Sequence, residues 1–518
     1  MSTLVELSPA DSSPSVRLHS DTLAASVVLL LVMTVAQRAI GFGRGVLFCR
    51  WLEPAQLGEW DVALGFLNLA APLVVLGLPG CFGRYVEYFR QRGQLHLFLR
   101  RTAVVALAMA ALAILGIVLA RQGFSRLIFG TDAQSQTVVW LAAALAAVIA
   151  NNTVCSLFIA ARQYRLVTMI QFVQSLLFAI VALGLLASRP PGSTSVVIGW
   201  FAATALSTML AIPWLQQWIS TEPADRANPD RGGFWAKLLP FALWMWVTNL
   251  LSNLFEVIDR FMIVHHGGWP AEEALRQVGN YHSSRILPLL FVSVAVMLGS
   301  MITPHLSVDW EVGRREAVVR RLNFVIKCLL VLLVTASVMV LFGAPLLFEL
   351  GFRNKFAGGL AVLPWTLIYC TWFGALAVTQ NYLWCAERAG LASLPLLVGL
   401  LTNVACQIVL LPRFGLYGAV WSTAIANFTA LVLLYRLSSW QGMQVDRGTW
   451  LLTLLPLAIA QGRWTALAAV VGVVIVAVSN DRLFSAGEKH EIAETFRRAA
   501  RRLKVWLHPR TRQMSEPA

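Results

Sequence analysis

Four arginines lie inside or at the ends of stretches that are otherwise apolar enough to cross a membrane: Arg38, Arg44, Arg260 and Arg285. Glu256 and Asp259 are the only acids expected at the same depth. Ionisable side chains inside a bilayer are costly, and they normally face a water-filled cavity or one another. A surplus of buried positive charge therefore predicts a cavity that receives an anion.

The arginines suit an anionic head group because a guanidinium stays charged in any environment and presents a fork of donors to phosphate oxygens. The two acids are candidates for coupling to a proton or sodium gradient, or for structural pairing. In a purely structural alternative, Arg260 pairs with Glu256 one helical turn back. Arg285 then pairs with Asp259, and the cluster only pins helices together. This alternative leaves the two arginines of the first apolar stretch unmatched.

The composition is that of a polytopic membrane protein. Of the 518 residues, 58% are hydrophobic and 13% are charged, and the mean hydropathy is +0.68. A soluble domain could not cover that much apolar surface. The net charge of +15 is spread over short segments between apolar runs, which favours membrane topology over nucleic-acid binding.

Runs of roughly 20 apolar residues predict an all-α protein with about 14 transmembrane helices. They span residues 24–48, 57–79, 97–120, 136–160, 166–188, 195–219, 238–265, 278–301, 322–343, 359–385, 391–411, 415–437, 449–462 and 464–480. An even number of crossings places both termini on one side. Most of the 41 lysines and arginines fall on that side, so both termini are predicted to be cytoplasmic.

An internal repeat divides the chain into two pseudo-symmetric six-helix lobes plus two C-terminal helices. Residues 58–60 match 279–281, 127–129 match 346–348, and 161–162 match 386–387. Parallel six-helix repeats place binding sites between the lobes. The predicted parts are a cytoplasmic N-terminal segment (1–23), an N-lobe (24–219), a cytoplasmic linker (220–237), a C-lobe (238–437), two additional helices (438–480) and a basic cytoplasmic tail (481–518).

Several short motifs resemble the polysaccharide transporter family, the Wzx-type oligosaccharide flippases of the larger group that also contains MATE exporters and lipid II flippases. These motifs are QRAIGFGR at 37–44, RWLEP at 50–54, LGEW at 57–60, GLPG at 77–80, RYV at 84–86 and PRFGLYGAV at 412–420. The resemblance implies two six-helix lobes around a central cavity. It also implies transfer of a lipid-linked glycan from the inner to the outer leaflet of the cell inner membrane.

On this resemblance, we expect the four arginines to bind the diphosphate of a polyprenyl-linked oligosaccharide used in cell-surface polysaccharide or lipopolysaccharide biosynthesis. Expected partners are this lipid-linked glycan, the membrane, and the glycan polymerase and glycosyltransferases of the same pathway, with no nucleic acid. No cofactor and no enzymatic activity are expected. No metal is expected either, because the adjacent His265 and His266 cannot both face one ion from a helix.

Two other functions remain open at this point. A MATE-type small-molecule exporter would share the architecture, but it would favour acids in its cavity to attract cationic compounds. A membrane glycan polymerase or glycosyltransferase would handle the same substrate, but it needs a long outer loop. The longest predicted outer connection, between residues 265 and 278, is only about a dozen residues.

Overall fold

The structure is a computed structural model that describes residues 23–188, 190–222, 233–481, 483–491, 493–494 and 497. Most residues in these ranges are helical, and the ranges contain no β-strand. The predicted all-α fold is therefore confirmed. Residues 223–232 of the predicted linker and most of the predicted basic tail lie outside the described ranges.

The first half of the chain forms a series of long helices joined by short turns. They are α1 (Leu23–Trp51), α2 (Pro54–Val74), the 3-10 turn η1 (Leu78–Cys81), α3 (Phe82–Gln91), α4 (Leu95–Leu119), α5 (Arg121–Phe129), α6 (Ser135–Ala160), α7 (Tyr164–Ser188) and α8 (Ser193–Thr221). The short helix α3 buries one face, with Phe82, Tyr85, Val86 and Phe89, and leaves Arg84, Glu87 and Arg90 exposed.

The second half repeats this style of construction. It contains α9 (Gly233–His266), α10 (Ala271–Arg285), α11 (Pro288–Glu311), α12 (Arg315–Leu346), the π-turn η2 (Leu347–Gly351), α13 (Ala357–Thr379), α14 (Asn381–Cys385), α15 (Ala389–Phe414), α16 (Leu416–Trp440), α17 (Arg447–Leu454), the 3-10 segment η3 (Leu455–Gln461) and α18 (Arg463–Ser479). Within the described residues, eleven helices are long and apolar enough to span a membrane. The count of fourteen stays a prediction.

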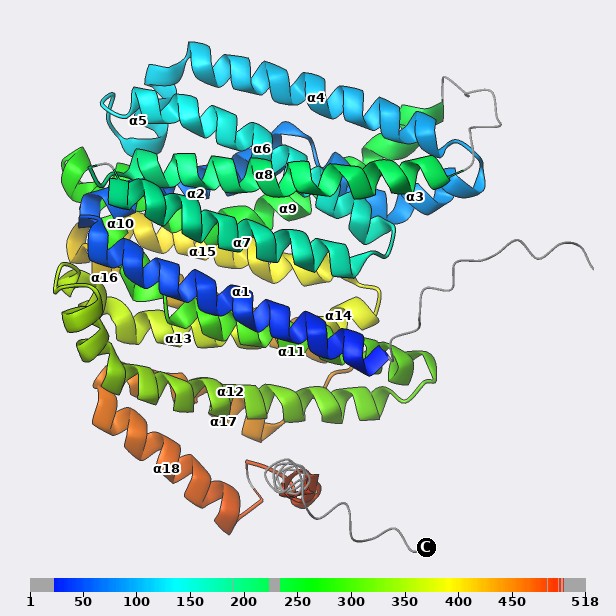
Figure 1. The fold of residues 1–518 in the computed structure, drawn as a ribbon. Coiled ribbons are helices and arrows are strands. Elements are labelled where there is room, and N and C mark those ends of the chain that lie inside the picture. The colour runs from blue at the N-terminus through cyan, green and yellow to red at the C-terminus, as the bar shows by residue number, and fades with distance from the viewer. Residues whose placement is uncertain are drawn as a thin grey trace, which may run out of the picture.

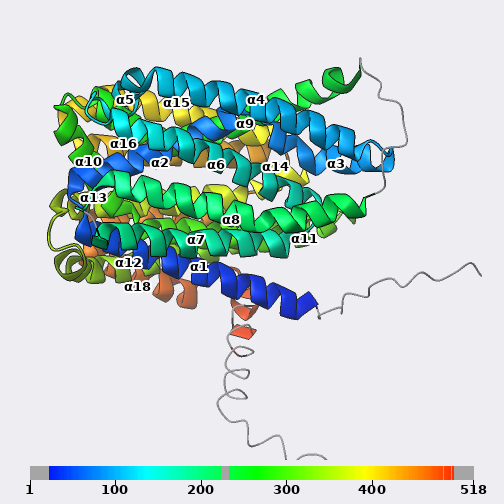
Figure 2. The same ribbon diagram turned by 45° about the horizontal axis from the view of Figure 1, so that its top comes forward.

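The long helices run roughly side by side, with α4 along one edge of the bundle and α12 and α18 along the opposite edge (Figure 1). In the first half, α8 packs against α6 and α7, and in the second half α16 packs against α13 and α15. Helix α2 contacts both α9 and α10 and so joins the two halves. The turned view keeps α3 and α5 at opposite ends of the bundle (Figure 2).

The predicted span 278–301 is wrong as a single helix. Helix α10 ends at Arg285, and α11 starts anew at Pro288. Proline fits the first turn of a helix because its missing N–H would have no intrahelical acceptor there. The apolar run continues across the interruption, so hydrophobicity alone did not reveal it. As a consequence, Arg285 lies at a helix end beside a break.

Backbone geometry at the ends of α6 and α14 matches between the two halves. After α6, Arg162 has φ 60° and the Gln163 amide donates to the Phe158 carbonyl over 2.8 Å. After α14, Glu387 has φ 56° and the amide of the next residue, Arg388, donates to a carbonyl five residues back over 2.9 Å. The same turn thus recurs at equivalent places of the repeat noted in the sequence.

Two glycines from the repeated sequence face each other where α2 crosses α10. A Cβ atom added at Gly58 would lie 1.8 Å from the Leu275 carbonyl oxygen, and one added at Gly279 would lie 1.9 Å from the Pro54 oxygen. Such distances mean that the two backbones are in direct contact. Small residues allow this close approach between membrane helices. The crossing fixes the start of α2 against α10.

A buried lysine ties α12 to segments that follow α16 and α18. The Lys327 Nζ donates to Asp446 over 2.8 Å, to Glu488 over 2.7 Å and to the Leu483 carbonyl over 3.2 Å. Burial by itself raises the pKa of the Asp446 carboxyl, but hydrogen bonds from Lys327 and Thr449 outweigh burial and lower that pKa from its ordinary value. The carboxylate therefore stays ionised at neutral pH and keeps the lysine paired.

The α2–α10 crossing generates a stability prediction. Replacing Gly58 by Ala forces the two backbones apart, and overpacking of this kind costs about 1–3 kcal/mol. We expect a lower unfolding temperature of the detergent-purified protein, measured by fluorescence-detected size exclusion after heating. Gly43→Ala is the matched control because nothing lies within 4 Å of its added Cβ atom. If the Gly58→Ala and Gly43→Ala proteins had equal unfolding temperatures, the direct backbone contact between α2 and α10 would be contradicted.

Candidate functional site

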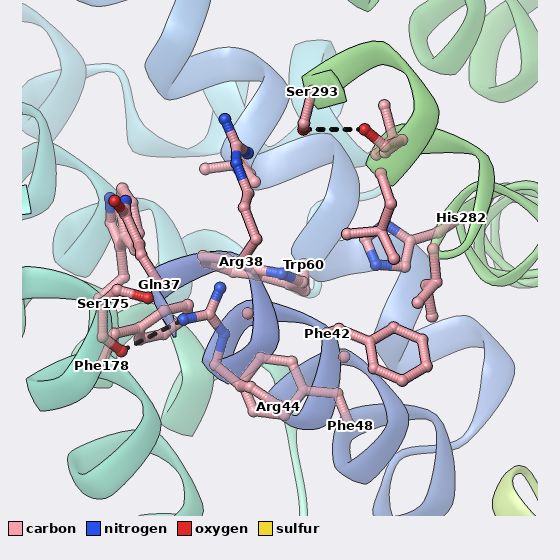
Figure 3. Close-up of a pocket in the computed structure, with 17 residues that line it drawn as sticks. Gln37, Arg38, Phe42, Arg44, Phe48, Trp60, Ser175, Phe178, His282 and Ser293 are labelled. Carbon is pink, nitrogen blue, oxygen red and sulfur yellow. Dashed lines mark hydrogen bonds between the residues drawn. The ribbon is translucent and has the colours of Figure 1, made fainter. Parts of the chain in front are cut away.

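A cavity of about 300 Å³ lies between the two halves of the chain, and we name it the arginine cavity (Figure 3). It is lined from α1, α2, α7, α8, α10 and α11 by Gln37, Arg38, Gly41, Phe42, Arg44, Gly45, Phe48, Trp60, Leu64, Ser175, Phe178, Trp200, His282, Ile286, Leu289, Leu290 and Ser293. Figure 3 shows His282 on the side of the cavity opposite Arg44, while the Ser293 hydroxyl donates over 2.9 Å to the Leu289 carbonyl of its own helix.

Arg44 lies against the wall formed by α7. Its guanidinium carbon is 4.2 Å from the centre of the Phe178 ring, and its Nη1 is 3.4 Å from the Ser175 carbonyl oxygen, a long hydrogen bond. In the described part of the chain no carboxylate lies within ion-pair distance of Arg44. An aromatic face compensates a cation only partly, so the charge of Arg44 is available to an anion.

Arg38 is exposed and lines the cavity, six residues before Arg44 on α1. Figure 3 shows the two guanidinium groups pointing in different directions from α1. Among the described residues, Arg38 has neither a hydrogen bond nor an ion pair. The cavity thus presents two positive charges without a protein counter-charge.

Unlike Arg38 and Arg44, Arg260 is buried and forms an ion pair. Its Nε donates to Asp61 Oδ2 over 2.7 Å, and its Nη1 donates to the Glu256 backbone carbonyl over 2.9 Å. The other Asp61 oxygen lies 2.8 Å from His282 Nδ1. Asp61 is 1% exposed and Arg260 is 6% exposed. This ion pair joins α9 to α2, and His282 connects it to the arginine cavity.

In the purely structural alternative Arg260 pairs with Glu256, and this pairing is wrong. The carboxylate partner of Arg260 is Asp61, and the Glu256 side chain is exposed. Glu256 and Asp259 are also not the only acids at this depth, because Asp61 lies inside α2 and fully buried. Arg260 forms its ion pair with Asp61 of α2 and not with the Glu256 carboxylate one turn back on its own helix, because α9 is rotated so that Arg260 points toward α2.

Asp259 is the centre of a second buried network, inside the second half. Its Oδ2 accepts a hydrogen bond from the Tyr281 hydroxyl over 2.7 Å. Its Oδ1 accepts from Asn403 Nδ2 over 2.7 Å and from Gln407 Nε2 over 2.6 Å. The pairing of Arg285 with Asp259 in the purely structural alternative is wrong, because these three donors from α10 and α15 occupy the carboxylate.

Arg285 lies at the end of α10 and is 5% exposed. Its guanidinium carbon lies 5.1 Å from the centre of the Tyr281 ring, and its Nε has no hydrogen-bond partner in the described structure. Together with Glu256 and Asp259 it lines a smaller cavity of about 100 Å³. Leu289 lines both this cavity and the arginine cavity, so the two are neighbours.

The structure thus divides the four predicted arginines into two exposed to the arginine cavity and two buried beside acids or tyrosines. Sequence reasoning missed Asp61 and His282. Both lie within predicted membrane spans, 57–79 and 278–301, and the rule that a charged or titratable residue in a span needs a partner would have identified them.

The long apolar helices and the cavity between the two halves define a multi-pass, all-helical membrane protein. The chain belongs to the polysaccharide biosynthesis protein family, whose model matches residues 23–308, more than half of its length. No curated protein matches the chain in sequence.

Solved structures of transporters share the fold. A lipid II flippase, MurJ, in an inward closed conformation aligns with a TM-score of 0.64 at 15% identity, over 87% of this chain and 97% of its own. An inward-facing multidrug resistance MATE transporter of the MOP superfamily aligns at 0.63 with 14% identity, over 78% and 94%. An outward-facing one aligns at 0.56 with 13% identity, over 80% and 95%. These identities establish similarity of fold alone.

The buried pair leads to a prediction about stability. Arg260→Leu removes the arginine partner of the buried Asp61 and leaves its direct contact with His282, and breaking a buried pair in this way costs about 3–5 kcal/mol. The double variant D61L/R260L removes both charges, so we expect it to recover most of that loss. The measurement is the unfolding temperature of the purified variants, together with their amount in the membrane.

Arg276→Leu provides the control, because Arg276 and Glu273 form an ion pair with side chains 56% and 37% exposed. An exposed pair is worth at most about 1 kcal/mol. If R260L were no less stable than R276L, the pair would not hold the two halves together.

Proposed function

We propose that the protein is a flippase that moves a lipid-linked oligosaccharide, attached through a polyprenyl diphosphate, from the inner to the outer leaflet of the cytoplasmic membrane. The product would serve the biosynthesis of a cell-surface polysaccharide. The single observation that supports this best is the pair of cavity arginines, Arg38 and Arg44, which lack a carboxylate partner among the described residues. The family match supports the same pathway.

The chemistry of the arginine cavity suits a phosphorylated glycan. Guanidinium groups donate paired hydrogen bonds to phosphate oxygens, and these bonds strengthen where water is excluded. Trp60, Phe178 and Trp200 form an aromatic cluster on one side, with ring centres 5.4 Å apart for the first two and 4.9 Å for the last two. Trp60 and Phe178 are buried and Trp200 is half-buried, so Trp200 is the ring of these three that can pack against a sugar. A cationic drug would instead meet two positive charges, which disfavours a MATE-type exporter of such compounds.

The proposed mechanism is alternating access. Contacts between the halves occur at both predicted ends. At the outer end they are the α2–α10 glycine crossing and the 2.8 Å ion pair of Lys355 with Glu53. At the cytoplasmic end, Gly77 lies against Ala242, and the rings of Tyr85 and Phe241 are 5.7 Å apart. Separation of the cytoplasmic contacts would admit the cargo, and separation of the outer contacts would release it. The lipid tail would remain in the bilayer throughout.

Glycosyltransferases of the pathway would supply the cargo at the inner leaflet, and a glycan polymerase would use it at the outer leaflet. In this proposal both kinds of enzyme are partners because they share the lipid-linked glycan with the transporter. No nucleic acid is involved.

The phosphate role predicts the effect of removing either arginine. We expect Arg44→Ala and Arg38→Ala to lower glycan delivery about 10- to 100-fold, since a hydrogen bond to a charged group is worth about 1.5–3 kcal/mol. Delivery is measured as surface polysaccharide in cells that depend on the variant, at equal protein levels in the membrane. Arg126→Ala is the control because this arginine is 70% exposed and bound to Asp132. Unchanged delivery for both cavity variants would reject the role.

Glu256 is the acid best placed for energy coupling, while Asp259 has a structural position. Glu256 is exposed, lines the small cavity, and has no hydrogen bond to its carboxylate among the described residues. The other titratable side chains that line the same cavity are Asp259, Tyr281, Arg285, Tyr369 and Cys370. A carboxylate with free access can exchange a proton or bind a cation during the cycle.

If Glu256 couples transport to a proton gradient, Glu256→Gln abolishes the dependence of transport rate on external pH while the protein still inserts. The measurement is uptake of fluorescent lipid-linked glycan into the protected leaflet of proteoliposomes with and without a pH gradient. Glu311→Gln serves as control, because Glu311 is exposed at the end of α11, outside both cavities. An unaltered pH response in E256Q would remove Glu256 from the mechanism.

A further inference from the structure

A second cavity between the two halves differs in chemistry from the first. It measures about 380 Å³ and is formed by α2, η1, α6 and α9. Four amides line it, Asn68, Asn152, Asn249 and Asn253, with Ser156, several glycines and prolines, and apolar side chains. None of its lining residues is charged or a histidine. We name it the amide cavity.

The amide cavity continues the arginine cavity along one face of α2. Trp60 and Leu64 line the arginine cavity, and Asn68, Pro72 and Val75 line the amide cavity. These positions follow one another at steps of three or four residues, so they form a single stripe. Leu64 and Asn68 are separated by about 6 Å along the helix axis. The stripe therefore runs from the predicted outer half into the predicted inner half.

Helix α9 provides the opposite wall with the same periodicity. Asn249 and Asn253 line the amide cavity, and Glu256, one turn further, lines the small cavity beside Arg285. Helices α2 and α9 are in contact with each other. One polar track thus follows both helices and leads from the uncharged amides to the arginines.

The amides of this track have unused hydrogen-bonding capacity. Among the described residues, the side chains of Asn68, Asn152 and Asn249 have no hydrogen-bond partner, and the first two are exposed on long apolar helices, in their C-terminal halves. Pro72 also has no N–H to donate to the Asn68 carbonyl four residues earlier. Polar groups left without partners in hydrocarbon are costly, so these amides require water or a polar ligand.

The neighbouring Asn151 shows what a structural amide looks like in the same helix. It is 6% exposed, and its Nδ2 donates to Thr208 Oγ1 of α8 over 3.0 Å. Its Oδ1 accepts from the Cys155 thiol over 3.7 Å. Asn151 thus holds α6 to α8, whereas Asn152 points its free amide at the cavity.

The chemistry of the amide cavity selects a neutral ligand rich in hydroxyl groups. Each asparagine side chain offers two donors and an acceptor, which matches hydroxyls that both donate and accept. Without a cation in the lining, the cavity has nothing to neutralise a phosphate. The backbone at Gly77 and Gly80 leaves part of the wall without side chains.

We propose that the amide cavity binds the sugar residues of the cargo while the arginine cavity holds its diphosphate. This inference rests on the proposed function. In the state seen here, the glycan extends from the arginines along α2 toward the predicted cytoplasmic end. The amide cavity then recognises the length and the hydroxyl pattern of the glycan, and the arginines recognise the group common to all such lipids.

The test compares two lipids in proteoliposomes: a polyprenyl diphosphate with one N-acetylhexosamine, and the lipid-linked oligosaccharide extracted from host cells that lack the transporter. In the N68A/N152A/N249A variant we expect transport of the long lipid to fall at least tenfold, since each neutral hydrogen bond lost lowers affinity about three- to tenfold. Transport of the single-sugar lipid should change less than twofold. Asn151→Ala is the matched control and should reduce stability but not the ratio of the two rates.

Arg44→Ala separates this inference from the proposed function. If R44A transports neither lipid while the triple variant transports both at the wild-type rate, the amide cavity has no part in glycan recognition and the flippase proposal stands. If the wild-type protein transports neither lipid, the proposed function itself fails, whereas wild-type rates in R44A would reject only the phosphate role of Arg44.

A second measurement does not depend on transport. Asn152→Cys and Asn151→Cys are introduced after the seven native cysteines have been replaced by Ala or Ser, and inverted membrane vesicles are treated with a small charged maleimide. We expect N152C to react, N151C to remain unreacted, and the extracted lipid-linked oligosaccharide to protect N152C. An unreactive N152C, or one that the lipid does not protect, would overturn the proposal.

Discussion

The ion pair between Arg260 and Asp61 is the contact on which the arrangement of the two halves depends. Both side chains are nearly inaccessible, and a buried charge without its partner costs several kcal/mol. The pair therefore holds α9 to α2 at one register. One turn of α2 closer to its start, the Gly58–Gly279 crossing holds α2 to α10. Because α2 is fixed on both of these helices, its cavity-facing stripe lies between the halves.

The interior separates charges according to their partners. Arg260 has Asp61, and the carboxylate of Asp259 is occupied by a tyrosine and two amides. Arg38 and Arg44 have no carboxylate among the described residues, so they give the arginine cavity its positive sign. Low dielectric strengthens the interaction of such charges with an entering anion. Paired charges provide structure here, and unpaired charges define what the cavity can bind.

The break between α10 and α11 also shapes the interior. A continuous helix through residues 286–287 would direct α11 along the axis of α10, but Pro288 begins a new helix there. Arg285 then lies at a helix end, stacked over Tyr281, beside the exposed carboxylate of Glu256. Discontinuous helices at a site between repeats are a general feature of transporters. Here the break places a buried arginine next to the proposed coupling acid.

The sequence by itself determined the all-helical class, the position of most long apolar helices, and the presence of arginines inside them, because apolar run length reports directly on what the membrane requires of a backbone. The matching turns after Ala161 and Ala386 were also visible as a repeat. The sequence did not determine which of the four arginines forms an ion pair with an acid. A partner such as Asp61 is about 200 residues away from Arg260 and is selected by helix rotation and crossing angle.

Those rotations arise from packing between helices far apart in the chain, as at Gly58 and Gly279, and no local pattern encodes them. For the same reason, only the tertiary structure distinguished Asn152, free in a cavity, from Asn151, bonded to Thr208 one helix away. Adjacent residues on a helix point about 100° apart. The sequence therefore supplied the polar groups, and the packing of α2, α6 and α9 decided which of them face the path between the two halves.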